Sequence, residues 1–191
     1  MINIVLNTLK EKLNEYFRVM GSSHEDVVQF ISSSNNDPIS FTNDKVTPFL
    51  INVSEDRKFR EADLFASVVQ DGIKTQINPE VRIELLILFV SKFNDYNQAL
   101  TFLSYIIKFF QANRVLTPLN SPQLAEGDIE KLVIELISLP LEEQNQVWHS
   151  LNTSYLPSLL FRIRLLCFMD EQEIQLASGQ LSELQVNVNE N

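Results

Sequence analysis

The residue types that most often carry chemistry are sparse in this chain and stand apart from one another. His24 and His149 are its two histidines, and neither has cysteines or carboxylates beside it at the spacing of metal ligands. The single cysteine, Cys167, lies in an apolar run, where an inert buried thiol is expected rather than a nucleophile. The four glycines are too widely spaced to form a loop that cradles phosphate. We therefore expect no metal site, no cofactor, no catalytic residues and no enzymatic activity.

Two arginines are the remaining candidates for a binding site. Arg162 and Arg164 lie two residues apart within a predicted strand, so both side chains should point to the same face of the sheet. From that face they could bind an anion. The more ordinary alternative is that they pair with acids on neighbouring strands, such as Glu84 or Glu135, since opposite charges across a sheet stabilise it.

The arginines belong to the most apolar part of the chain, residues 139–168. A short helix is expected first, with Glu142 and Glu143 in its first turn, where the helix dipole favours acids. Adjacent residues diverge by about 100° around a helix, so these carboxylates should not form a catalytic pair. The helix carries Trp148, the only tryptophan, on its apolar face. A strand follows, and its buried face is expected to consist of Leu159, Phe161, Ile163, Leu165, Cys167 and Met169.

Hydrophobic periodicity predicts the elements that position this stretch. Apolar residues recur at helical spacing over residues 2–20 and 95–112, and Asp95 can cap the second of these helices. Pro48 cannot donate a ladder hydrogen bond, so its strand should lie at a sheet edge or begin near this residue. The predicted strands cover residues 27–31, 39–41, 46–53, 80–90 and 129–139.

Two of these strands carry predictions about burial. In strand 80–90 one face changes from Arg82 and Glu84 to apolar residues, so the far end should be buried on both sides. In strand 129–139 alternation separates an outward Glu130 from an inward row. The residues expected in that inward row are Leu132, Ile134 and Leu136.

Together these elements predict a single α+β domain over residues 1–171, with a mixed β-sheet and helices packed mainly on one face. A chain of 191 residues can bury such a core without disulfides or metal ions. Residues 55–76 are expected to form a long loop with one helical turn at most. Residues 172–191 are expected to form a flexible, acidic and polar C-terminal tail.

The charge balance and the N-terminus exclude other classes of protein. A net charge of −10, from 15 basic and 25 acidic residues, argues against a surface that binds nucleic acid. The N-terminus lacks the basic segment of a signal peptide, and no uninterrupted apolar run reaches the length of a membrane helix. We therefore expect a soluble protein made in the cytoplasm.

Six apolar residues are the candidates for contacts with another protein. Phe102 and Phe109 lie at the rim of the apolar face of helix 95–112, which is wider than the roughly 100° that one packed side needs. They either nestle in a curved sheet or meet another subunit. Phe59 and Phe65 stand in the loop 55–76, where they either tuck back onto the core or bind a partner. In the tail, Val186 and Val188 belong to an alternating run that could be donated as a strand.

Five blocks of sequence have an order and spacing that match one known family. They are NPEVRIELLILF at 78–89, YNQALTFLSYIIKFFQ at 96–111, EKLVIEL at 130–136, EEQNQVW at 142–148 and YLPSLLFRIRLL at 155–166. Together they resemble the tail-terminator, or cap, family of extracellular contractile injection systems, which are phage-tail-like particles. The amphipathic start and VTPFLINVSEDR at 46–57 are similar to the same family. The resemblance covers about residues 2–169.

This resemblance implies a structural protein without catalytic residues. Its subunits are expected to form a ring, a hexamer, that sits on the distal end of the inner tube and outer sheath and stops their growth. The implied partners are further copies of the chain and the terminal tube and sheath subunits, with no nucleic acid and no membrane insertion. The implied location is the cytoplasm during assembly and afterwards a particle that is released or membrane-associated.

Two roles within such a particle remain open. A terminator is expected to add its tail or its edge strands to strands of sheath or tube subunits, because main-chain hydrogen bonds then supply affinity. The alternative is an adaptor, or binding module, that is attached to the particle without terminating it.

Overall fold

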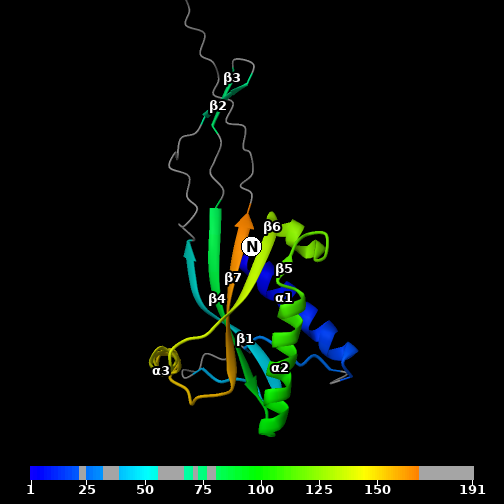
Figure 1. Ribbon diagram of the computed structural model, residues 1–191, viewed down its shortest axis with the longest axis vertical. Helices are drawn as coiled ribbons and strands as arrows, with labels where there is room; N and C mark the ends of the chain where they lie inside the picture. The colour runs from blue at the N-terminus through cyan, green and yellow to red at the C-terminus, as the bar shows by residue number, and fades with distance from the viewer. Residues whose placement is uncertain (22–24, 32–38, 56–66, 71–72, 77–80, 168–191) are drawn as a thin grey trace, which may run out of the picture. The chain divides into compact units, whose positions relative to one another are not determined.

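The computed structural model describes residues 1–21, 25–31, 39–55, 67–70, 73–76 and 81–167 (Figure 1). The chain divides into two compact units, one formed by residues 1–61 and 80–169 and the other by residues 62–79 and 170–191. In the second unit, β2 (Ser67–Gln70) and β3 (Ile73–Gln76) form an antiparallel hairpin in which Ser67 lies opposite Gln76. The sequence-based prediction of a loop was therefore wrong for these two short strands.

A five-stranded antiparallel sheet forms the centre of the first unit, in the order β1-β4-β7-β6-β5. Its strands are β1 (Lys45–Glu55), β4 (Val81–Lys92), β7 (Ser158–Cys167), β6 (Ile129–Ile137) and β5 (Val115–Leu116). The α+β class is confirmed, but the prediction of a mixed sheet was wrong. A helix between two strands does not by itself fix their direction, and α3, which connects β6 to β7, returns the chain antiparallel to its neighbour.

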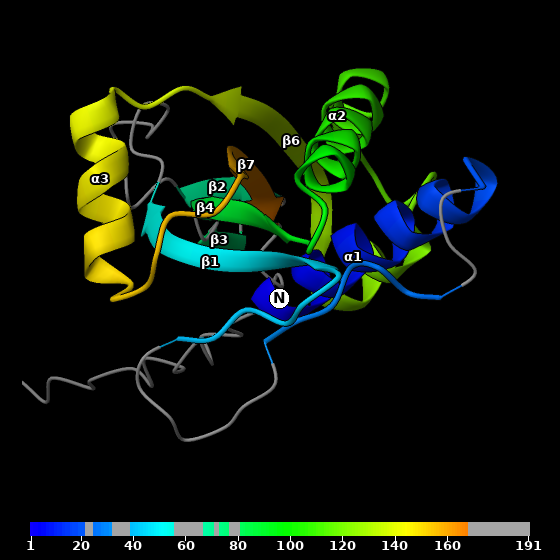
Figure 2. The ribbon, with the colours of Figure 1, turned by 90° about the horizontal axis from the view of Figure 1, so that it is seen from below.

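Two helices cover one face of this sheet (Figure 2). They are α1 (Ile2–Val19) and α2 (Tyr96–Ala112), and the Asp95 side chain caps α2 by accepting a hydrogen bond from the Asn97 N–H at 3.0 Å. Phe161 on β7 packs edge-to-face with Phe89 on β4 at 5.6 Å between ring centroids, and Phe110 of α2 lies 4.7 Å from Phe161. These rings form the centre of the larger hydrophobic core.

The third helix, α3 (Leu141–Ser150), packs on the opposite face and seals a second, smaller core. Trp148 is 4% exposed there, and its ring lies 6.2 Å from that of Phe41. Leu88 and Val90 are buried in this second core while Ile87 and Phe89 are buried in the first. The far end of β4 is thus buried on both sides, as predicted.

A segment without regular structure runs beside β1 and is tied to α1. The Val46 N–H donates to the Val27 carbonyl at 2.9 Å, and the Gln29 N–H donates to the Val46 carbonyl at 3.0 Å. Asn14 of α1 is buried and forms two hydrogen bonds with the backbone of Val28, at 2.8 and 3.0 Å. The described residues of 27–31 and 39–41 thus contain one isolated parallel bridge, between Val28 and Val46, instead of the two predicted strands.

Other predictions about the strands have mixed outcomes. β1 is an edge strand, as Pro48 indicated, and Leu159, Phe161, Ile163 and Leu165 belong to the larger core, as alternation predicted. The Cys167 side chain and Met169 lie outside the described part of the chain. The burial of Leu136 was predicted wrongly, since this residue is 48% exposed. It continues the inward row of β6 beyond the point where helices cover the sheet.

Candidate protein interaction surfaces

Four charged side chains form a network on the same face of the sheet as α3, in the part that this helix does not cover. Arg164 forms a two-pronged ion pair with Glu135, with N···O distances of 2.9 and 3.2 Å. The Arg162 Nε atom lies 3.0 Å from Glu84 Oε1, and longer contacts of 3.8 and 3.9 Å join the two pairs. The pairing of these arginines with cross-strand acids is therefore confirmed. Two carboxylates balance two guanidinium groups, so this network is not a ready site for an anion.

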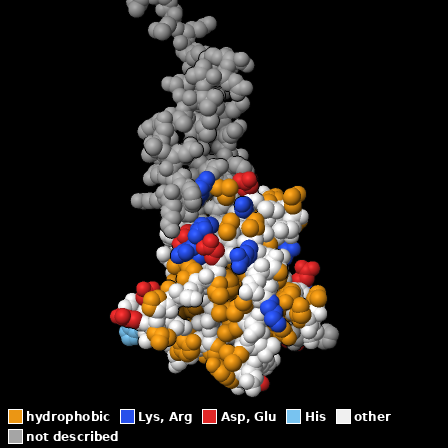
Figure 3. Space-filling view, viewed as in Figure 1, with side chains coloured by type: hydrophobic (Ala, Val, Ile, Leu, Met, Phe, Trp, Pro, Cys, Tyr) orange, Lys and Arg blue, Asp and Glu red, His pale blue; other side chains and the backbone are white. Residues whose placement is uncertain are grey.

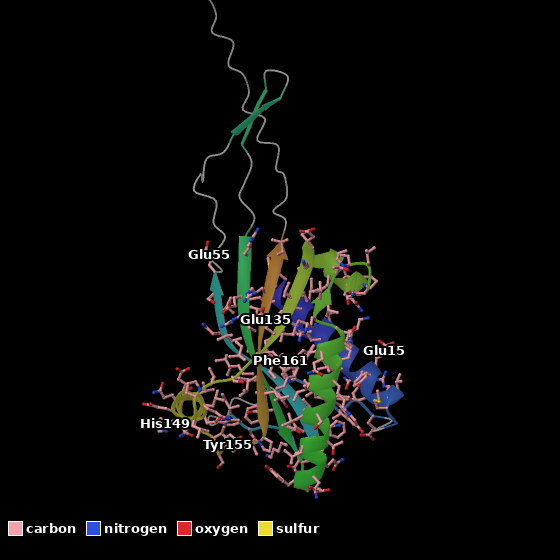
Figure 4. All side chains as sticks on the ribbon, viewed as in Figure 1. Glu15, Glu55, Glu135, His149, Tyr155 and Phe161 are labelled. Atoms are coloured by element: carbon pink, nitrogen blue, oxygen red, sulfur yellow. The ribbon has the colours of Figure 1, made fainter. Side chains whose placement is uncertain are left out.

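The network is only partly shielded from water. The exposed fractions of its side chains range from 20% for Glu84 to 43% for Glu135. Figure 3 shows acidic and basic side chains together on this face, with apolar side chains next to them. In Figure 4, Glu135 lies well apart from His149 and Tyr155, which belong to the end of the molecule near α3. The sheet face therefore has a charged part that α3 does not cover and an apolar part under α3.

The described residues offer no cluster of chemical groups besides this network. Within residues 1–21, 25–31, 39–55 and 81–166, no three His, Cys, Asp or Glu side chains are placed to hold a metal ion. His149, Glu142 and Glu143 are all exposed on α3, and His24 lies outside the described residues. The geometry thus directs attention to surfaces that can bind a protein.

The six predicted interface residues fall into two groups. Phe102 and Phe109 are 3% and 6% exposed, so neither lies on the surface of the subunit. Phe102 stacks on Phe93 at 4.8 Å and meets Phe17 of α1 at 5.1 Å. Both rings therefore lie in the core of the subunit, where α1 rather than a curved sheet covers the rim of the wide apolar face. The other predicted interface residues are outside the described residues: Phe59, Phe65, Val186 and Val188.

The outer edge of β1 is covered by another segment at one end. Along the rest of this edge, no described strand lies beside β1. Segment 27–29 bonds to Val46, but from Pro48 to Ser54 β1 pairs with β4 alone among the described residues. The pairing register shifts between Leu50 and Asn52, which marks a β-bulge of the kind found at sheet edges. Beyond the bulge Val53 is 45% exposed. This open edge could accept a strand from another chain.

The opposite side of the sheet has a second open edge, at the end of β6. The two-residue strand β5 pairs with Leu132 and Val133, and the Ile134 N–H donates to the Arg114 carbonyl. No described strand lies beside the rest of β6, from residue 135 to 137. Alternate residues of a strand direct their N–H and C=O groups to opposite neighbours, so Leu136 directs its groups to the same side as Ile134. That side is the open edge.

A pocket of about 240 Å³ lies between this end of β6, the start of β7 and α3. Leu88, Leu160 and Val147 give it an apolar lining, and Gln144 adds a polar group. Trp148 also lines it, and its indole N–H is buried without a hydrogen-bond partner. The pocket and the open end of β6 could not be predicted from the sequence, since they depend on the order of the strands, whereas Pro48 had indicated the edge position of β1.

A comparison with known families identifies the class of protein that has this fold. The model of the Pvc16 N-terminal domain family matches residues 4–178, which is most of the chain. The chain belongs to this family. The membership confirms the resemblance that the sequence blocks carried. No match was found among curated proteins.

Two solved structures share the fold. One is the sheath/tube terminator, in the extended state, of the extracellular contractile injection system PVC, with a TM-score of 0.63 and 17% identity. The other is the tube-terminating cap of the anti-feeding prophage, with a TM-score of 0.60 and 15% identity. They match 100% and 97% of this chain, which in turn covers 64% and 61% of theirs. The chain therefore spans less than two thirds of the length of these relatives.

In the part of the chain that the structure describes, no helix combines the length and the hydrophobicity needed to cross a bilayer.

Proposed function

We propose that this chain is a tail-terminator, or cap, subunit of a contractile injection system. The supporting observation is its membership of the Pvc16 N-terminal domain family over residues 4–178. Two proteins of known structure with this fold are a sheath/tube terminator and a tube-terminating cap. The subunit acts as a structural component: it assembles in the cytoplasm into a hexameric ring and binds the last tube and sheath subunits of the particle.

The open edge of β1 suits this role. A terminator must bind the last subunit of a growing polymer without offering the same surface again, so that no further subunit can add. An edge strand binds one additional strand through main-chain hydrogen bonds, and its other side is already occupied, here by β4. We assign the edge from Pro48 to Ser54 to contact with a strand of the tube or sheath.

Within this edge, Val53 is the position that can be altered most selectively. It lies opposite Leu85, six residues before Ser91 on β4. The Ser91 N–H donates to the Pro157 carbonyl on the β7 side, so by alternation Leu85 also directs its backbone groups toward β7 rather than β1. Its own N–H and C=O therefore point outward. A proline at position 53 removes an outward donor while the ladder between β1 and β4 keeps its bonds.

The experiment that tests the function compares particles from a strain that lacks this gene with particles from the same strain carrying the gene on a plasmid. Loss of a terminator should give sheaths and tubes of uncontrolled length, or particles that fall apart, and the plasmid should restore one length. Electron microscopy measures both. Normal lengths in the deletion strain would contradict termination and support the alternative function, an adaptor that is attached to the particle.

A further inference from the structure

The pocket under α3 and the open end of β6 form one continuous site, which the assigned contact of β1 does not use. Residues 136–139 of β6 and of the chain after it line the pocket. The same strand end has no described partner on its outer side. A peptide strand that paired with this edge would therefore place alternate side chains next to the pocket under α3.

Trp148 lines the pocket and carries a buried indole N–H. Trp148 is 4% exposed, and its Nε1 atom has no hydrogen-bond partner. A buried donor without a partner is unfavourable, and a carbonyl oxygen of a bound chain that reached the indole N–H would remove this penalty. Tyr155, which is 60% exposed, packs on the Trp148 ring at 5.5 Å between centroids.

The size of the pocket favours amino-acid side chains over a small molecule. Sites for cofactors and drug-sized ligands usually enclose about 300–1,000 Å³, and this pocket is smaller, at about 240 Å³. Its lining is mainly aliphatic, with Gln144 and two serines able to bond to a peptide backbone. Aliphatic residues at alternate positions of an extended segment fit these features.

The chain itself contains such a segment. Leu184, Val186 and Val188 alternate with polar residues, so all three side chains lie on one side when the segment is extended. The segment follows the last described strand, β7, which ends at Cys167. The intervening 16 residues, 168–183, can span at most about 55 Å. This reach is longer than the ten-residue strand β7 that precedes the segment, at about 3.3 Å per residue.

We propose that residues 184–188 of one copy add as a strand to the open end of β6 in the neighbouring copy and insert apolar side chains into the Trp148 pocket. The contact is heterologous, since the tail of one subunit binds a different surface of the next. Heterologous contacts are the kind that closes a ring of more than two subunits. The inference rests on the proposed function, which supplies the ring.

Trp148 makes the site directly measurable, because it is the only tryptophan of the chain. The experiment follows its fluorescence in the full-length protein over a dilution series, for the wild type and for the double variant Val186→Asp/Val188→Asp. A matched double variant, Val186→Leu/Val188→Leu, keeps the apolar side chains. Thermal unfolding of all three proteins confirms that they are folded to the same extent.

We expect the wild type and the leucine variant to show one emission spectrum when concentrated and another when dilute, as subunits separate. The aspartate variant should keep the dilute spectrum throughout. Adding a synthetic peptide of residues 180–191 to the aspartate variant should restore the concentrated spectrum in a saturable manner, whereas a scrambled peptide should not. Identical spectra for wild type and aspartate variant, or no response to the peptide, would overturn the proposal.

A wild-type spectrum that differs from the aspartate variant but does not change on dilution would also overturn it, because the tail would then bind its own subunit. These outcomes are independent of particle length. If the tail does not bind while the deletion strain still produces particles of uncontrolled length, the inference fails and the proposed function stands. If the tail binds but particle length is normal, the proposed function fails.

Discussion

The two faces of the central sheet differ in what covers them. On one face α1 and α2 bury an apolar layer that runs through β1, β4, β7 and β6. On the other face α3 covers one end, and the rest carries the ion pairs of Glu84, Glu135, Arg162 and Arg164. The first face therefore provides the stability of the subunit, while the second face and the strand edges remain available to other chains.

The largest loss of unfolding free energy should come from a substitution on the face that α1 and α2 cover. Replacing Phe102 with alanine removes a ring that is 3% exposed and packs against Phe17 and Phe93. We expect the isolated subunit to lose about 3–5 kcal/mol of unfolding free energy, as for other buried phenylalanines. Urea denaturation measures this loss. A loss below about 1 kcal/mol, combined with weaker ring assembly, would instead make Phe102 an interface residue.

A smaller loss is expected where α1 holds the segment beside β1. Asn14→Ala removes both hydrogen bonds to the backbone of Val28 and leaves that buried N–H and carbonyl without partners. We expect a loss of about 1–3 kcal/mol. Hydrogen exchange at the Val46 amide, which bonds to Val27, should become faster than at the amides of β4. Unchanged exchange at Val46 would show that the segment is held by other contacts.

The ion pairs beside α3 should contribute less to the unfolding free energy than the covered face does. Their contribution should decrease as the salt concentration rises. Glu84→Gln keeps the shape of the side chain but removes the charge that faces Arg162, in a network that is 20–43% exposed. We expect a loss of about 1 kcal/mol at low ionic strength, shrinking as salt is added, because water and ions screen partly exposed pairs. Denaturation at several salt concentrations tests this. A loss as large as that of Phe102→Ala would remove the distinction between the two faces.

The smallest change in unfolding free energy should come from a substitution at the open edge of β1. Val53 is 45% exposed, so Val53→Ala should change the unfolding free energy by no more than about 0.5 kcal/mol. Urea denaturation under the conditions used for Phe102→Ala gives the comparison. A loss above about 2 kcal/mol would indicate that Val53 is packed within the subunit and is unsuitable for docking.

The structural features that depend on alternation along a single strand were predicted correctly from the sequence. The period of two in β7 predicted both the buried row that includes Phe161 and the charged row of Arg162 and Arg164. Alternation also placed Leu136 on the inward side, but it cannot show where a covering helix stops. The segment near Val28 was misread as a strand because its partner, Asn14, lies on a separate helix.

The interaction surfaces depend on the arrangement of strands relative to one another. Pro48 indicated that β1 is an edge strand, but the open end of β6 becomes visible only when the strand order is known, and the pocket next to Trp148 requires three elements to meet. The family resemblance indicated a protein that binds others, but it could not indicate which edges of the sheet are open.

The most direct test of the account compares Val53→Pro with Val53→Ala in the strain that lacks the chromosomal gene. Both substitutions remove the exposed valine side chain, but only proline removes the outward N–H from the edge of β1. The measurement is the distribution of sheath lengths in electron micrographs of purified particles. We predict that the alanine variant restores uniform length, whereas the proline variant, present at the same level and folded, leaves the lengths uncontrolled. Uniform length with the proline variant would contradict the assignment of the β1 edge to termination.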